Sequence, residues 1–185
     1  DKFDSVISLM KDAVSIGMPH SIGHDFHEDI EARFVKAHRI PCPTGLPRID
    51  APDILDGGLG RGEIGVVTAN TGVGKSHYLV AMGANALRSG KNVLHYTFEL
   101  TETAVGRRYI DINDLMASKK KVLDFYEKQD LGRLIIKEYP TGAASVITIR
   151  NHIEKLSLKG FKPSLIVIDY ADIMKSTKAY DSLRH

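Results

Sequence analysis

The sequence has a single cysteine, Cys42, which lies between two prolines. One cysteine cannot form an intramolecular disulfide, so we expect a reducing, intracellular setting and interpret Cys42 as a loop or packing residue. The sequence also lacks an apolar run long enough to span a membrane, and its N-terminus alternates charged and apolar residues, unlike a signal peptide. We therefore expect neither a disulfide-stabilised secreted domain nor a membrane protein.

Charge of one sign is also scarce, because the formal net charge of the 185 residues is only +2. Any contact with nucleic acid would therefore have to come from a local patch. The histidines show no spacing typical of zinc ligands, since no cysteine or acidic pattern completes the pair His24 and His27. No Ser/His/Asp order of the hydrolase type is present either.

What the sequence does contain is a glycine-containing loop, Ala-Asn-Thr-Gly-Val-Gly-Lys-Ser, at residues 69–76. It stands between a short apolar run at 64–68 and a longer one at 78–87. These runs predict a strand at 64–68 and a helix at 75–89, and strand, loop, helix is the order that a phosphate-binding loop needs. Alanine replaces the first glycine of the usual pattern, which is the smallest available change.

Each residue type in this loop suits a nucleoside triphosphate. Gly72 and Gly74 let the backbone curl so that its N–H groups point at phosphate oxygens, and the helix N-terminus adds a positive dipole. Lys75 would reach the β- and γ-phosphates of ATP, and the Ser76 hydroxyl would ligate Mg²⁺. The predicted nucleotide-binding residues are Asn70, Thr71, Gly72, Val73, Gly74, Lys75, Ser76 and His77.

Beyond the loop, strand and helix patterns alternate. Further strands are predicted at 92–98, 134–137 and 165–168, and further helices at 116–129 and 145–158. Another helix is predicted after Thr101, with Val105, Tyr109 and Ile112 on one face. Gly83 lies inside the helix at 75–89, where it costs about 1 kcal/mol relative to alanine, so we expect close packing there. The alternation predicts an α/β fold with a mainly parallel sheet covered by helices on both faces.

The N-terminal part has a different character. Residues 3–16 and 25–38 carry apolar residues at helical spacing, whereas residues 41–60 are rich in proline and glycine and read as an irregular connector. We expect a helical arm at 1–40, packed on its own domain or on a neighbouring subunit, and a nucleotide-binding domain at 41–185. The chain lacks a starting Met and stops inside a segment whose pattern continues to its last residue, so we expect a fragment.

Two acidic residues end predicted strands. Asp169 closes an apolar strand, where a carboxylate is costly unless it meets a cation, so we expect it at Mg²⁺ together with Ser76, directly or through water. The alternative is an aspartate that caps a turn. Because ligands bind at the carboxyl ends of parallel strands, one sheet edge would gather the phosphate loop, Glu99 and Asp169.

Glu99 is the candidate base for a water molecule aligned on the γ-phosphate. The alternative is an acid that favours the start of the next helix, before Thr101. Glu102 and Asp172 are competitors for the role of base. Lys119–Lys121 read as a solvated helix face, with a DNA-facing patch as the alternative.

Several segments in order resemble the RecA-like motor domain of DnaB-type replicative helicases, especially the phage branch. The resemblance covers residues 41–185 and rests on Pro43–Asp50, Gly57–Leu59, the phosphate loop, Tyr96–Leu100 and Leu165–Tyr170. Tyr170 directly after Asp169 is similar to the helicase version of the motif. Recombinases more often carry a small polar residue at that position, so a RecA- or KaiC-like ATPase that controls filament or ring assembly ranks second.

The resemblance implies a ring, usually a hexamer, that binds ATP between neighbours and moves on single-stranded DNA, with a primase or loader as further partners. It implies Lys75 and Glu99 as catalytic residues and a bacterial or phage-infected cytoplasm. It places the stretch 175–180 toward DNA, where Lys175 and Lys178 could hold phosphates and Tyr180 could stack. A sensor strand and a basic finger of the family are expected beyond His185.

Overall fold

The structure is a computed structural model that describes residues 5–7, 30, 34, 39–112, 118–128 and 130–176. The chain divides into two units, Asp1–His38 and Arg39–His185. In the first unit residues 5–7 are helical, and most of the helices predicted at 3–16 and 25–38 lies outside the described residues. Within the described part, no helix combines the length and apolarity needed to cross a bilayer.

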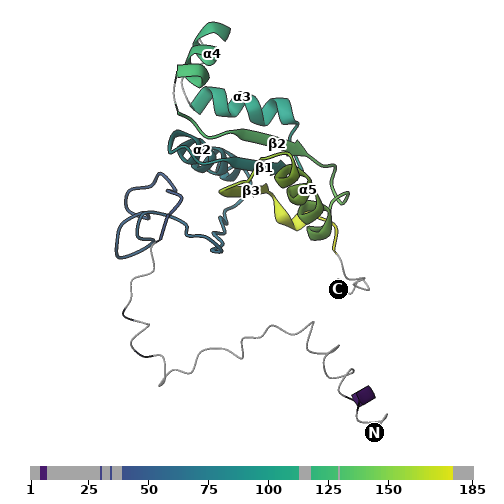
Figure 1. Ribbon diagram of the computed structural model, residues 1–185. Helices are drawn as coiled ribbons and strands as arrows, with labels where there is room; N and C mark the ends of the chain where they lie inside the picture. The colour runs from purple at the N-terminus through teal and green to yellow at the C-terminus, as the bar shows by residue number, and fades with distance from the viewer. Residues whose placement is uncertain are drawn as a thin grey trace. The chain divides into compact units, whose positions relative to one another are not determined.

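Three parallel strands form the sheet of the second unit, and their spatial order is β2-β1-β3. Their bounds are β1 (Val93–Thr97), β2 (Leu134–Glu138) and β3 (Leu165–Asp169). The register places Thr97 beside both Glu138 and Asp169, so the three carboxyl ends meet at one edge. The predicted parallel sheet is confirmed, and Figure 1 shows the strands stacked side by side.

Helices cover both faces of this sheet. The helices are α2 (Lys75–Arg88), α3 (Glu102–Ile112), α4 (Lys119–Lys128) and α5 (Val146–Leu158), and a short 3-10 helix, η2 (Ala171–Ile173), follows β3. Val93 of β1 packs in one core cluster with residues of α2 and α3, whereas Leu94 and Tyr96 pack in another with Ile149 of α5. Successive residues of β1 thus point to opposite faces of the sheet. Because helices cover both faces, every residue of β1 is buried.

The prediction of a strand at 64–68 is wrong. These residues are irregular, and Ile64 and Val66 are 88% and 79% exposed. An apolar run becomes a strand only when a neighbouring strand takes up its N–H and C=O groups. In the described part of the chain no strand pairs with this run, and none of its residues makes a backbone hydrogen bond.

The connector predicted at 41–60 is irregular, as expected. An isolated antiparallel bridge joins Cys42 to Leu59, and Cys42 is buried as a packing residue. The Asp50 carboxylate accepts hydrogen bonds from the N–H groups of Thr44 (3.0 Å) and Gly45 (2.9 Å). The Asn85 amide donates to the Thr44 carbonyl (3.4 Å), which ties the connector to α2.

Candidate nucleotide-binding site

The loop that precedes α2 has a backbone that requires glycine. Gly72 has a φ of 82° and Gly74 a φ of 103°, both in the left-handed region. A β-carbon added at either position meets no described residue within 4 Å, so the requirement is conformational and not steric. The curl that the two glycines allow leaves residues 69–73 exposed.

The start of α2 offers unpaired donors. Within the described part of the chain no side chain caps this helix, and its first turn has no acidic residue. The first helical hydrogen bond runs from the Tyr78 N–H to the Gly74 carbonyl (2.9 Å), and among the described residues the N–H groups of 74–77 find no acceptor. Free N–H groups together with the helix dipole form an anion-binding site.

The side chain of Lys75 lies within the curl of its own loop. Its ammonium donates to the carbonyls of Ala69 (2.7 Å) and Asn70 (3.0 Å). Ser76, on the same turn, is half-buried. The remaining residues predicted to bind nucleotide are Asn70, Thr71, Val73 and His77, which are all exposed.

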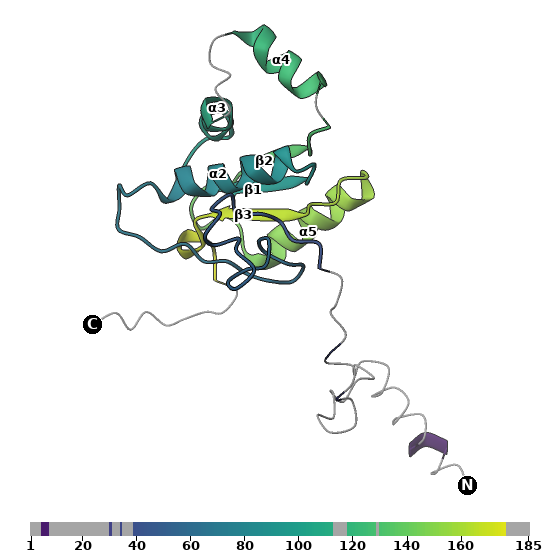
Figure 2. The ribbon, with the colours of Figure 1, turned by 90° about the vertical axis from the view of Figure 1, so that its left-hand side faces the viewer.

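Asp169 stands at the sheet edge near this loop. It is 3% exposed at the end of β3, and its carbonyl accepts from the Phe98 N–H (2.9 Å). Helix α2 packs on β1 and β3, and Figure 2 shows the N-terminal end of α2 on the side where β3 ends. The hydroxyl of Ser76 and the carboxylate of Asp169 are the oxygen ligands that Mg²⁺ prefers, so the donor set fits that ion.

The three candidate bases differ in what they contact. Glu99 is exposed in the bend after β1 and makes no hydrogen bond within the described part of the chain. The Glu102 carboxylate, in contrast, accepts from the Glu138 N–H (3.1 Å) and from the Lys137 ammonium (3.4 Å). The Glu138 carboxylate accepts from the Glu102 N–H (3.2 Å) in return. Asp172 lies exposed in η2.

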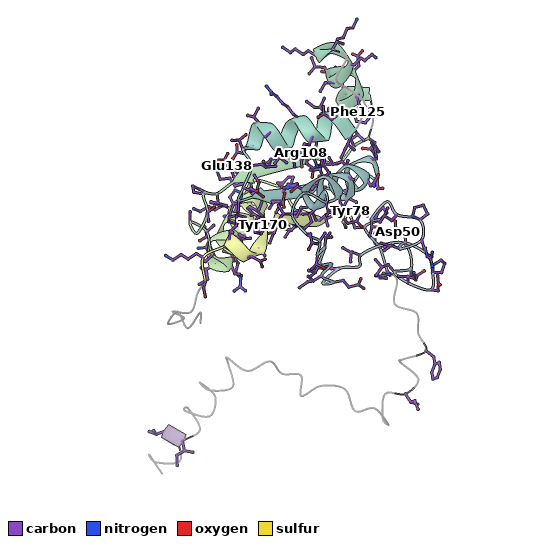
Figure 3. All side chains as sticks on the ribbon, turned by 180° about the vertical axis from the view of Figure 1, so that it is seen from behind. Asp50, Tyr78, Arg108, Phe125, Glu138 and Tyr170 are labelled. Atoms are coloured by element: carbon purple, nitrogen blue, oxygen red, sulfur yellow. The ribbon has the colours of Figure 1, made fainter. Side chains whose placement is uncertain are left out.

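This exchange of hydrogen bonds commits Glu102 to a structural contact. The Glu138 N–H, and secondarily Lys137, lower the pKa of Glu102 against the opposing effect of partial burial. Figure 3 labels Glu138, at the end of β2 that meets the start of α3. Among the three carboxylates, Glu99 is therefore the one that is exposed at the end of a central strand.

Sequence reasoning missed a buried polar cluster around His95 of β1. His95 is fully buried, and its Nδ1 lies 3.0 Å from the Tyr109 hydroxyl. His95 Nε2 and Arg108 Nη1 are buried and find no hydrogen-bond partner among the described residues, and Figure 3 labels Arg108 on α3. Burial lowers the pKa of His95 to about 4, with Asp169 opposing the shift and Arg108 adding to it. A histidine and a threonine within an otherwise apolar strand were the available signal.

Of the residues predicted to contact DNA, the structure describes only Lys175. Lys175 is exposed, and its backbone N–H donates to the Ala144 carbonyl (2.9 Å). Lys178 and Tyr180 lie outside the described residues. Lys119–Lys121 are exposed at the start of α4, in agreement with a solvated helix face.

Comparison with known proteins places the chain among helicase-related ATPases. No family model matches. The DnaB-like replicative helicase of Enterobacteria phage T4 is 35% identical over 193 residues, which cover 94% of this chain and 40% of that protein. DNA repair protein RadA of Mycobacterium tuberculosis is 25% identical over 78% of this chain and 25% of its own length. The chain thus spans less than half of either relative.

The solved structure of an ATPase domain aligns with 86% of this chain and 62% of its own length, with a TM-score of 0.58. The two share only 16% sequence identity, so this likeness establishes the fold. It confirms the predicted RecA-like α/β architecture.

Proposed function

Because this chain belongs to the DnaB-type RecA-like ATPase domains, we propose that it is the ATP-hydrolysing motor of a replicative DNA helicase. One observation carries the proposal. A glycine-dependent loop, whose N–H groups at 74–77 are unpaired among the described residues, opens α2 on the side of the sheet where β3 ends at Asp169 and where Glu99 follows β1. That arrangement would bring phosphate binding, metal binding and a base together.

The loop and its lysine would hold the triphosphate. N–H groups at 74–77 would donate to phosphate oxygens, and Lys75 would exchange the carbonyls of Ala69 and Asn70 for the β- and γ-phosphates. Ser76 and Asp169 would hold Mg²⁺. When bound, that ion neutralises the charge that develops on the transferred phosphoryl group.

Glu99 would accept the proton of the attacking water. Its exposure at the tip of the bend after β1 leaves the carboxylate accessible to a water aligned on the γ-phosphate. Hydrolysis would then be coupled to movement of DNA-contacting segments, among which we place Lys175 and Lys178.

The finer assignments belong to the same proposal. We propose a ring, usually a hexamer, with ATP between neighbouring subunits, residues 1–40 as a linker arm, and single-stranded DNA, a primase or a loader as partners. Such a protein acts in the bacterial or phage-infected cytoplasm.

A strand-separation assay tests this function. The complete protein that carries this domain should separate a forked DNA duplex when ATP and Mg²⁺ are supplied, and should not when Lys75 is replaced by alanine. ATP-dependent filaments that form on DNA without strand separation would contradict the helicase.

A second candidate is an ATPase in which nucleotide controls assembly on DNA or protein. The observation that favours it is the 25% identity with RadA, a DNA repair protein. A helicase needs a closed ring, whereas a filament needs open head-to-tail contacts, so electron microscopy of the ATP-bound protein on DNA separates the two.

A further inference from the structure

The last residue of β1, Thr97, has an unusual pair of contacts. Its side chain is fully buried, and its hydroxyl both donates to the Leu100 carbonyl (2.8 Å) and accepts from the Leu100 N–H (3.0 Å). A buried hydroxyl is costly unless it is paired, and here its hydrogen and a lone pair serve the same residue. The two bonds close the four-residue bend 97–100, and Glu99 is the third residue of that bend.

The strands hold the same bend on its other side. The Tyr139 N–H donates to the Thr97 carbonyl (3.0 Å), and the Phe98 N–H donates to the Asp169 carbonyl (2.9 Å). The backbone that enters the bend is therefore fixed by β2 and β3, while the backbone that leaves it is fixed by the Thr97 hydroxyl. Glu99 itself makes no hydrogen bond in the described part of the chain, so the position of its carboxylate depends on this backbone.

We propose that Thr97 is a positioning residue for ATP hydrolysis, whose hydroxyl fixes the bend that presents Glu99 to the attacking water. This inference rests on the proposed role of Glu99 as the base. Thr97 does not touch the nucleotide in this scheme. Its effect therefore falls on the rate of the chemical step and leaves the affinity for ATP unchanged, because misplacing a catalytic group slows reaction without weakening binding elsewhere.

Two substitutions at this position separate positioning from packing. Thr97→Val keeps the shape and removes the hydroxyl, which leaves both polar groups of Leu100 without their partner. Thr97→Ser keeps the hydroxyl and removes a buried methyl group. A purely structural role predicts that the serine variant is as impaired as the valine variant, whereas positioning predicts that serine retains turnover.

The experiment measures steady-state ATP hydrolysis and the Kd of a fluorescent ATP analogue in the complete protein with DNA present. For Thr97→Val we expect kcat to fall at least about tenfold while Kd changes less than about twofold. For Thr97→Ser we expect kcat within about threefold of the wild type. The matched control is Thr148→Val, which removes a threonine hydroxyl from the cap of α5, where it contacts Ser145, and should leave kcat unchanged.

Several outcomes would overturn the inference. They are an unchanged kcat in Thr97→Val, a joint loss of Kd and kcat, or a serine variant as slow as the valine variant. Thr97→Ala removes the same hydroxyl and takes the place of the valine variant if that protein does not fold.

Glu99→Gln distinguishes failure of the inference from failure of the proposed base. If Glu99→Gln keeps wild-type turnover, the base assignment falls. If Glu99→Gln is inactive and Thr97→Val is not, the positioning role alone falls. The double variant should be no slower than Glu99→Gln, because Thr97 acts through Glu99, and a further decrease would contradict that.

Discussion

The hydroxyl of Tyr109 occupies the space that a β-carbon on Gly83 would need, so α3 meets α2 at the level of the helix backbone. The same hydroxyl lies 3.0 Å from His95 Nδ1, which brings β1 into the contact. This arrangement confirms the close packing expected at Gly83. It also connects the helix that begins at the phosphate loop to the helix that follows Glu99.

The first prediction concerns this contact. Gly83→Ala should lower the free energy of unfolding by about 1–3 kcal/mol because the new methyl group overlaps the Tyr109 ring. In an unobstructed helix interior the same change would gain up to about 1 kcal/mol. Urea unfolding followed by circular dichroism measures the difference.

Gly106→Ala is the matched control. A β-carbon there would lie 3.7 Å from the Ile136 side chain, an ordinary contact, so this variant should be slightly more stable than the wild type. Gly83→Ala should cost less in a Tyr109→Phe background than in the wild type, since the overlapping hydroxyl is absent there. Equal effects of the two glycine substitutions would contradict the steric account.

The second prediction concerns pH. Burial holds the pKa of His95 at about 4, below its ordinary value of 6.5, and the groups around it are Asp169 on β3 with Arg108 and Tyr109 on α3. Between these values the unfolded chain binds more protons than the folded one. The free energy of unfolding is therefore at its full value above about pH 6.5 and falls, by up to about 3 kcal/mol, as the pH approaches 4.

Replacement of His95 shows how much of the pH dependence of stability comes from this residue. His95→Gln can still hydrogen-bond the Tyr109 hydroxyl but does not titrate in this range. We expect the free energy of unfolding of the variant to depend less on pH between 6.5 and 4, as measured by denaturant titrations at several pH values. Parallel curves for the variant and the wild type would exclude His95 as the titrating group.

The sequence predicted those helices and strands whose packing follows from apolar patterns in the sequence. Apolar periodicity located α2, α5 and the three paired strands, and the rule that parallel strands end together placed Asp169 and Glu99 at one edge. The run at 64–68 was misjudged because hydropathy measures the tendency toward burial and not the presence of a pairing strand. The roles of Thr97 and His95 were out of reach because they depend on a bend and on the packing of α3.

The third prediction separates the two glutamates near the end of β1. Glu99→Gln should keep ATP binding and lower kcat by about two to four orders of magnitude, because a general base is lost. Glu102→Gln should keep turnover, because that carboxylate is committed to the Glu138 N–H and to Lys137. Its cost in stability should be below about 1 kcal/mol, since the contact is exposed to solvent. Loss of turnover only in the Glu102 variant would reassign the base.

The fourth prediction concerns Lys75, whose ammonium donates to the carbonyls of Ala69 and Asn70. Lys75→Ala removes the only cation in the loop 69–76, so the Kd for ATP should rise about 10- to 100-fold, as expected for the loss of charge-assisted hydrogen bonds. Lys162→Ala, at an exposed lysine after α5, is the control for a change of net charge and should bind normally. Fluorescence titration with an ATP analogue measures both, and wild-type affinity in Lys75→Ala would contradict the phosphate-binding role of this loop.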